Sequence, residues 1–139
     1  MQENKEVYEV KINVEFGKSA KRFVNKKKFT KLAGQIRQLT QELEEGNFTG
    51  DIVKQKMNPA YTVYKKRLPN LDTKVGKSNG YRVIYIVMHE NSVVGLLDIY
   101  YKKEDETLPD LYIEALIDVF IMELEEQAEQ TEVSEQSQQ

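Results

Sequence analysis

The sequence predicts an α+β protein: a small, twisted, mainly antiparallel sheet with an N-terminal helical hairpin and a C-terminal helix. Three observations predict this class. Residues 7–16 alternate between apolar and polar side chains, residues 29–43 repeat apolar side chains every three or four positions, and residues 61–102 contain apolar stretches separated by short turns. Strands joined by turns this short must run antiparallel, so we expect one sheet with helices packed on a face.

The N-terminal third is expected to form one strand followed by two helices. Residues 7–16 have the period of a half-buried strand, Gly17 is expected to end it, and Ser19 to cap a short basic helix that runs toward Lys28. A second helix is expected from Phe29 until Gly46 stops it. Its apolar stripe consists of Phe29, Leu32, Ala33, Ile36, Leu39 and Leu43.

The remaining strands and the last helix follow from apolar runs and turn signals. A strand that begins at residues 61–64 is expected to carry a basic triplet at its end, and Pro69 with Asn70 turns the chain. Residues 72–77 suit a short strand, 81–89 a central strand, 93–102 the last strand, and 110–126 a helix. Residues 1–126 are therefore expected to form a single domain, and the Glu-, Gln- and Ser-rich residues 127–139 a disordered tail.

Composition excludes several classes of protein. The chain has no cysteine and one histidine, His89, so we expect neither disulfides nor a metal site, and no cofactor is predicted. No apolar stretch approaches the length of a membrane span or a signal-peptide core, which predicts a cytoplasmic protein that makes no membrane contact.

Charge is separated along the chain, although the net charge is only -3. Residues 16–82 hold sixteen Lys and Arg against five acidic residues, whereas the segments on both sides are acidic. The second part of this basic half contains Lys65-Lys66-Arg67 and continues through Lys74 and Lys77 to Arg82. Basic side chains beside a rigid sheet are typical of proteins that hold a polyanion.

Three strings in this half and just after it resemble a known family. They are Lys66-Arg67-Leu68-Pro69-Asn70, Gly76-Lys77-Ser78-Asn79-Gly80-Tyr81-Arg82-Val83-Ile84-Tyr85, and Leu96-Leu97-Asp98-Ile99-Tyr100 with Lys102 two residues on. Together with the helical hairpin and the run at Leu111 to Ala115, they resemble the RelE/ParE superfamily of toxins from bacterial type II toxin-antitoxin pairs. The resemblance covers roughly residues 29–120.

The resemblance implies a compact RelE-like toxin, neutralised by a cognate antitoxin protein. The RelE branch cuts messenger RNA in the ribosomal A site, and this mRNA interferase activity is the function we expect. The ParE branch instead poisons DNA gyrase. A non-enzymatic gyrase inhibitor, or a catalytically weak relic that acts through antitoxin binding, is therefore the alternative.

Cleavage through the ribose 2′-hydroxyl needs a proton acceptor, a stabiliser of the dianionic transition state and a proton donor for the leaving 5′-oxygen. Lys, Arg and Tyr must supply them, because the one histidine lies at a strand end beside Glu90. Crowded lysines lower one another's pKa, which can make one of them a base. The catalytic candidates are Arg82, Lys74, Lys77, Lys103 and Tyr112, and the RNA-binding candidates are Lys65, Lys66, Arg67, Tyr81 and Lys102.

Arg82 is the strongest candidate, because a guanidinium stays charged and can contact a phosphate through two hydrogen bonds. The family also places a functional arginine at this position. On the residues alone, a structural arginine paired with Asp72 or Asp98 is the alternative. Tyr112 is a candidate only because it matches the family's C-terminal tyrosine. The pair Lys102-Lys103 departs from the family's Lys-Arg, which weakens planar phosphate recognition.

Overall fold

A computed structural model describes residues 7–53, 58–104 and 108–137, with the backbone alone from residue 131 onward. The chain divides into two compact units, Met1–Thr107 and Leu108–Gln139. The first unit contains β1 (Glu9–Ile12), α1 (Val14–Asn25), α2 (Leu32–Glu44), β2 (Asp51–Ile52), β3 (Tyr61–Leu68), β4 (Tyr81–Met88) and β5 (Val93–Tyr101). The second contains α3 (Asp110–Ser137).

The five strands form one sheet in the order β1-β5-β4-β3-β2. Three of the four neighbouring pairs are antiparallel, and β1 pairs with β5 in parallel. The expected α+β class with a mainly antiparallel sheet is therefore confirmed. β4 lies at the centre of the sheet and is buried along its whole length, in agreement with its continuous apolar sequence.

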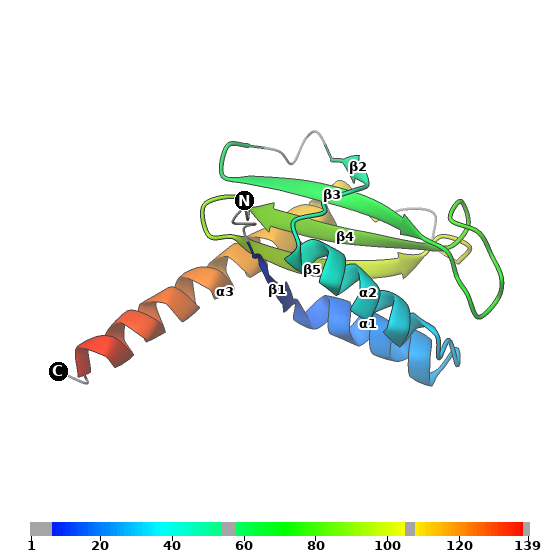
Figure 1. Cartoon of the computed structure of the whole chain (residues 1–139), viewed down its shortest axis with the longest axis horizontal. Helices are drawn as coiled ribbons and strands as arrows, with labels where there is room; N and C mark the ends of the chain where they lie inside the picture. Colours follow the sequence, from blue (N-terminus) through cyan, green and yellow to red (C-terminus); the bar gives the residue numbers. More distant parts are fainter. Residues whose placement is uncertain (1–6, 54–57, 105–107, 138–139) are drawn as a thin grey trace, which may run out of the picture. The chain divides into compact units, whose positions relative to one another are not determined.

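Helices α1 and α2 pack against each other on one side of the sheet (Figure 1). Their buried side chains, among them Phe16, Phe23, Leu32 and Leu39, share a core with alternate residues of β4 and β5. Helical and strand periodicities thus meet in one layer of apolar side chains. The expected packing of the second helix across the sheet is confirmed.

The first strand is shorter than the alternating pattern predicts. β1 ends at Ile12, and α1 begins at Val14, so that Ile12 and Val14 are exposed while Phe16 is buried. Gly17 is helical and Ser19 is no cap, because its hydroxyl donates to Asp98 at 2.7 Å. The alternating strand expected over residues 7–16 is therefore wrong beyond Ile12, and Phe16 reaches the core from a helix instead.

The segment between β3 and β4 is a compact loop rather than the expected strand at 72–77. A single bridge joins Asn70 and Val75, and the Asn70 side-chain oxygen accepts from the backbone N–H groups of Asp72 and Thr73. The Asp72 carboxylate in turn accepts from the backbone N–H of Lys31, at the start of α2. The loop is thereby fixed to the helix that crosses the sheet.

Helix α3 is longer than the sequence-based boundary at residue 126 predicts, since its backbone is helical to Ser137. The disordered tail expected over residues 127–139 stays a prediction: the backbone is helical over 127–137, and the last two residues lie outside the described ones. Residues 110–137 contain neither Gly nor Pro, and Glu and Gln have high helix propensity. The single domain expected over 1–126 likewise stays a prediction.

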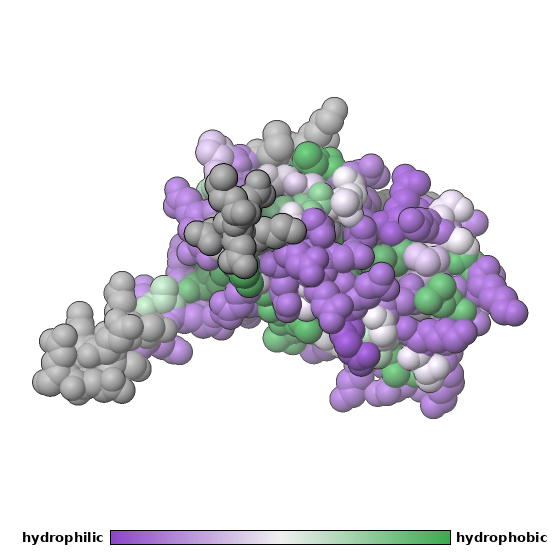
Figure 2. All heavy atoms as spheres, viewed as in Figure 1, coloured by the Kyte–Doolittle hydropathy of each residue, from purple (hydrophilic) through white to green (hydrophobic). Residues whose placement is uncertain are grey.

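Hydrophilic side chains dominate the face in Figure 2, with small hydrophobic patches between them. Among the described residues, no helix is both long and apolar enough to cross a membrane.

Candidate functional site

Two arginines face each other across neighbouring strands at one end of the sheet. The antiparallel register pairs Arg67 of β3 with Arg82 of β4, and Arg82 with Tyr100 of β5. Lys65 lies two residues before Arg67 and therefore shares its face of the sheet. This row of Arg67, Arg82 and Tyr100, together with Lys65, is called the arginine row below.

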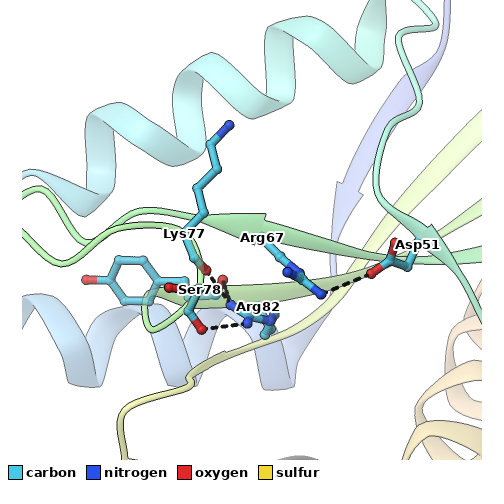
Figure 3. Close-up of polar contacts among 6 residues, drawn as sticks. Asp51, Arg67, Lys77, Ser78 and Arg82 are labelled. Carbon is cyan, nitrogen blue, oxygen red and sulfur yellow. Dashed lines mark hydrogen bonds and ion pairs between the residues drawn. The ribbon is translucent and has the colours of Figure 1, made fainter.

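Arg82 is only 6% exposed, and its guanidinium donates hydrogen bonds to backbone carbonyls. Its Nη1 donates to the oxygens of Lys77 at 2.8 Å and Tyr81 at 3.2 Å, and its Nη2 to that of Ser78 at 2.9 Å (Figure 3). The guanidinium has five N–H donors, so these three bonds leave two. Arg82 thus holds the end of the β3–β4 loop and retains donors for a further acceptor.

The acidic partners suggested for Arg82 by the sequence are engaged elsewhere. Asp72 accepts from Lys31, and Asp98 accepts from Ser19 and from the backbone N–H of Ile99. The structural alternative for Arg82 is realised through its hydrogen bonds to backbone carbonyls.

The arginine row is electrostatically unfavourable as it stands. Burial lowers the pKa of Arg82, and the neighbouring Arg67 lowers it further, while Tyr100 and Asp51 act in the opposite direction. The Arg67 guanidinium approaches the Asp51 carboxylate to 3.7 Å, and both side chains are more than half exposed (Figure 3). Like charges directly opposite in a sheet repel, and an exposed ion pair compensates little. The row is therefore suited to an anion that bridges both guanidinium groups.

A second feature lies on the opposite face of β3. A cavity of about 260 Å³ lies between α2, the end of β3 and the loop, and Lys66 and Lys77 are among its lining residues. Lys66 donates to the hydroxyl of Thr49, and the Lys77 ammonium points away from Arg82 (Figure 3). The remaining lining residues are Gln35, Gln38, Leu39, Glu42, Arg67, Leu68, Pro69 and Leu71.

The other predicted lysines occupy the same end of the sheet. Lys102 follows β5, and its backbone N–H donates to the carbonyl of Gly80. The next residue, Lys103, is exposed. Lys74 is exposed in the loop, where it adopts a φ of 60°. The structure thus brings Lys65, Arg67 and Arg82 together, and places Lys66 and Lys77 at the cavity.

Tyr81 cannot stack on a nucleic-acid base in this conformation, because it is fully buried. Its ring packs edge-on against Phe23 at 5.5 Å and lies beside Tyr101, and burial raises the pKa of its hydroxyl. The expectation of an RNA contact is wrong for the described conformation. Tyr81 lies on the helix-covered face, whereas the next residue, Arg82, lies on the other.

Tyr112 belongs to the second unit, where it lies in the first turn of α3 and is partly buried. His89 donates to or accepts from Thr62 at 2.8 Å, at the opposite end of β4 from Arg82. Among the described residues no cluster of His, Cys, Asp and Glu is arranged to hold a metal ion.

Sequence reasoning missed Asp51 and Tyr100 as neighbours of Arg82. No local signal marks Asp51, because β2 has only two residues and its pairing with Lys65 is set by the fold. Tyr100 had a signal in the strand period, but the bulge in β5 opposite Ile84 and Tyr85 shifts the register.

No protein-family model matches this chain, and no curated protein matches it. Among solved structures, the crystal structure of the isolated E. coli RelE toxin is similar, with a TM-score of 0.47 and 20% sequence identity. The alignment covers 81% of this chain and 98% of that one. Similarity this low says nothing about activity.

Proposed function

We propose that this protein is a RelE-like toxin that binds messenger RNA on the ribosome and cleaves it at the arginine row. The observation that carries the proposal is the Arg67–Arg82 pair, two like charges placed opposite each other with one exposed carboxylate nearby. An RNA phosphate between the guanidinium groups would turn this repulsion into charge-assisted hydrogen bonding. The strings that resemble the RelE/ParE superfamily support the same reading.

In the proposed reaction, the ribose 2′-oxygen bonds to phosphorus while the bond from phosphorus to the 5′-oxygen breaks. A 2′,3′-cyclic phosphate forms, a base takes the proton of the 2′-hydroxyl, and the leaving 5′-oxygen is protonated. Arg67 and the two remaining donors of Arg82 stabilise the additional negative charge of the transition state. Lys65 shares a face of β3 with Arg67, and Lys102 and Lys103 follow β5, which pairs with β4. One of these three lysines is the proposed base.

One observation favours the non-enzymatic alternative. The Arg82 guanidinium makes three bonds to backbone carbonyls, which by themselves account for a buried arginine. A gyrase inhibitor or a toxin relic needs no more than this structural role. Cleavage by variants of Arg67 and Arg82 distinguishes the two functions.

The proposed toxin requires an antitoxin that covers its basic surface. Residues 16–82 carry the excess of Lys and Arg, which would otherwise attract cellular RNA of any sequence. We therefore expect the antitoxin to be acidic where it contacts this region. Its co-expression should restore the growth of cells that produce the toxin.

The decisive variant is Arg67→Ala, because Arg67 is half-exposed and its guanidinium is held by a long ion pair, 3.7 Å, with Asp51. We expect messenger RNA cleavage, mapped at transcript ends with purified ribosomes, to fall on the order of 10²-fold with the fold intact. Arg37→Ala, at an exposed arginine of α2, is the matched control and should cleave normally. If the wild type cleaves no RNA with or without ribosomes, the enzymatic proposal is wrong.

Arg82→Lys tests the second guanidinium while keeping the charge. A lysine cannot reproduce the planar, forked donor set, so both loop positioning and phosphate binding should suffer. Cleavage by Arg82→Lys at the wild-type rate would remove Arg82 from the proposed site.

A further inference from the structure

Helix α3 is apolar on two opposite faces over its first three turns. One face consists of Ile113, Leu116, Ile117 and Phe120, which are all buried. The other carries Leu111, Val119 and Met122, which are 80%, 47% and 58% exposed, with exposed Ala115 between them. A helix of a globular protein normally has one apolar stripe, which packs on the core, and a polar opposite face. Packing on the core does not account for the second, exposed stripe.

The exposed stripe continues along the helix with a change of character. Positions 111, 115, 119, 122, 126 and 129 are separated by four, four, three, four and three residues, which keeps them on one side of an α-helix. The last two of these positions are Glu126 and Glu129, both exposed. The stripe is therefore apolar at its first four positions and acidic at its last two.

The charge of α3 excludes most occupants of this stripe. Residues 110–137 contain nine acidic residues and no Lys, Arg or His. A second copy of this protein would place the acidic residues of its own α3 against Glu126 and Glu129. Like charges across a helix interface are destabilising. Anionic lipid surfaces and nucleic acids are repelled in the same way.

We propose that this outer stripe of α3 is a docking site for a basic amphipathic helix of another protein. The partner helix would place apolar side chains against the first four positions and Lys or Arg against Glu126 and Glu129. This pairing buries the exposed apolar surface and neutralises the acidic end, as in heterotypic helix pairs selected by flanking charges. The proposal uses α3 alone and does not depend on RNA cleavage.

The test uses a synthetic helical peptide of roughly 20 residues, since shorter isolated helices are marginal in water. It carries leucines in the apolar positions and lysines opposite Glu126 and Glu129, and a second peptide carries glutamates instead of those lysines. Binding to the full chain is measured by fluorescence anisotropy. We expect the lysine peptide to bind the wild type on the order of tenfold or more tightly than the glutamate peptide.

Two variants locate the binding. Val119→Glu with Met122→Glu should weaken the lysine peptide on the order of tenfold or more, because apolar contacts in the centre of an interface dominate its affinity. Glu126→Lys with Glu129→Lys should reverse the preference, so that the glutamate peptide binds more tightly. Glu123→Lys, off the stripe, is the matched charge control and should retain the wild-type preference. Circular dichroism confirms that each variant is folded.

Three outcomes would overturn the proposal. The first is a lysine peptide that fails to bind, and the second is binding that ignores both stripe variants. The third is self-association of the wild type, measured by analytical ultracentrifugation, that the Val119→Glu and Met122→Glu changes abolish, which would assign the stripe to a second copy.

Discussion

At the scale of single residues, Arg82 combines a structural and a proposed functional role. Its three bonds to the carbonyls of Lys77, Ser78 and Tyr81 hold the loop end, and its position opposite Arg67 creates the charge repulsion that an anion would relieve. Loss of Arg82 would therefore disturb two properties at once. Substitutions at neighbouring residues test the electrostatic role without removing the hydrogen bonds that hold the loop.

Asp51→Asn tests the electrostatics of the arginine row. The change removes the carboxylate 3.7 Å from Arg67, and since both side chains are largely exposed, the free energy of unfolding should change by less than about 1 kcal/mol. RNA affinity, measured by filter binding at low salt, should rise because the anion no longer competes with Asp51. Weaker RNA binding by a folded Asp51→Asn protein would contradict the phosphate role of Arg67.

Tyr81→Phe tests the corrected role of Tyr81. The Tyr81 hydroxyl is buried without a hydrogen-bond partner in the described structure, so it contributes a desolvation cost and no compensating bond. Its removal should leave the free energy of unfolding unchanged or raise it by about 1 kcal/mol in urea denaturation. RNA cleavage should be unaffected. A stability loss of more than about 1 kcal/mol would reveal a partner for the hydroxyl.

At the scale of elements, the β3–β4 loop links the arginine row to α2. Asn70 organises its first half, Asp72 binds the backbone at the start of α2, and the Gln35 side chain donates to the Pro69 carbonyl at 2.7 Å. The loop ends at Gly80, whose carbonyl accepts from the backbone N–H of Lys102. The position of Lys77 therefore depends on contacts from α2 and from the strand ends.

Gly80→Ala tests this close packing. A Cβ built at Gly80 would lie 2.1 Å from the Leu68 carbonyl oxygen, so the backbone must shift. We expect a loss of about 2 kcal/mol or more in the free energy of unfolding, at the upper end of ordinary point mutations. Gly76→Ala in the same loop is the matched control, since a Cβ there meets nothing within 4 Å. Equal stability of the two variants in thermal denaturation would refute the close approach.

At the scale of the whole molecule, charge is distributed so unevenly that the pI of about 5.3 is misleading. Sixteen Lys and Arg lie in residues 16–82, while residues 110–137 have only acidic charges. Association with charged partners depends on local potential rather than on net charge. The basic segment 16–82 and the acidic segment 110–137 are thus suited to partners of opposite sign.

This separation predicts that the protein binds an immobilised polyanion despite its net negative charge. At pH 7 and low ionic strength it should be retained on heparin and elute as salt screens the basic surface. A variant with residues 65–67 changed to alanine should elute at lower salt, because it lacks three of the cations. If the wild type instead passes through the column at low salt, the acidic segments dominate the electrostatic potential of the protein.

The sequence by itself determined the elements with strong periodicity. The central strand at residues 81–88, the helix that buries Leu32, Leu39 and Leu43, and the α+β class follow from local patterns of apolar residues. Burial of one face is a local property of the chain, so period and composition carry it. The basic half is read directly from the sequence, whereas the functional role of Arg82 stays a prediction.

The tertiary structure alone decided which residues share a site. Whether Phe16 reaches the core from a strand or from a helix depends on what packs against it. Over residues 12–16 the apolar positions fit the period of a strand as well as that of a helix. The pairing of Arg67 with Arg82, the nearby Asp51, and the separation of Arg82 from buried Tyr81 depend on strand register. Register is set by contacts between segments distant in the sequence, and a shift of one residue exchanges the two faces of a strand.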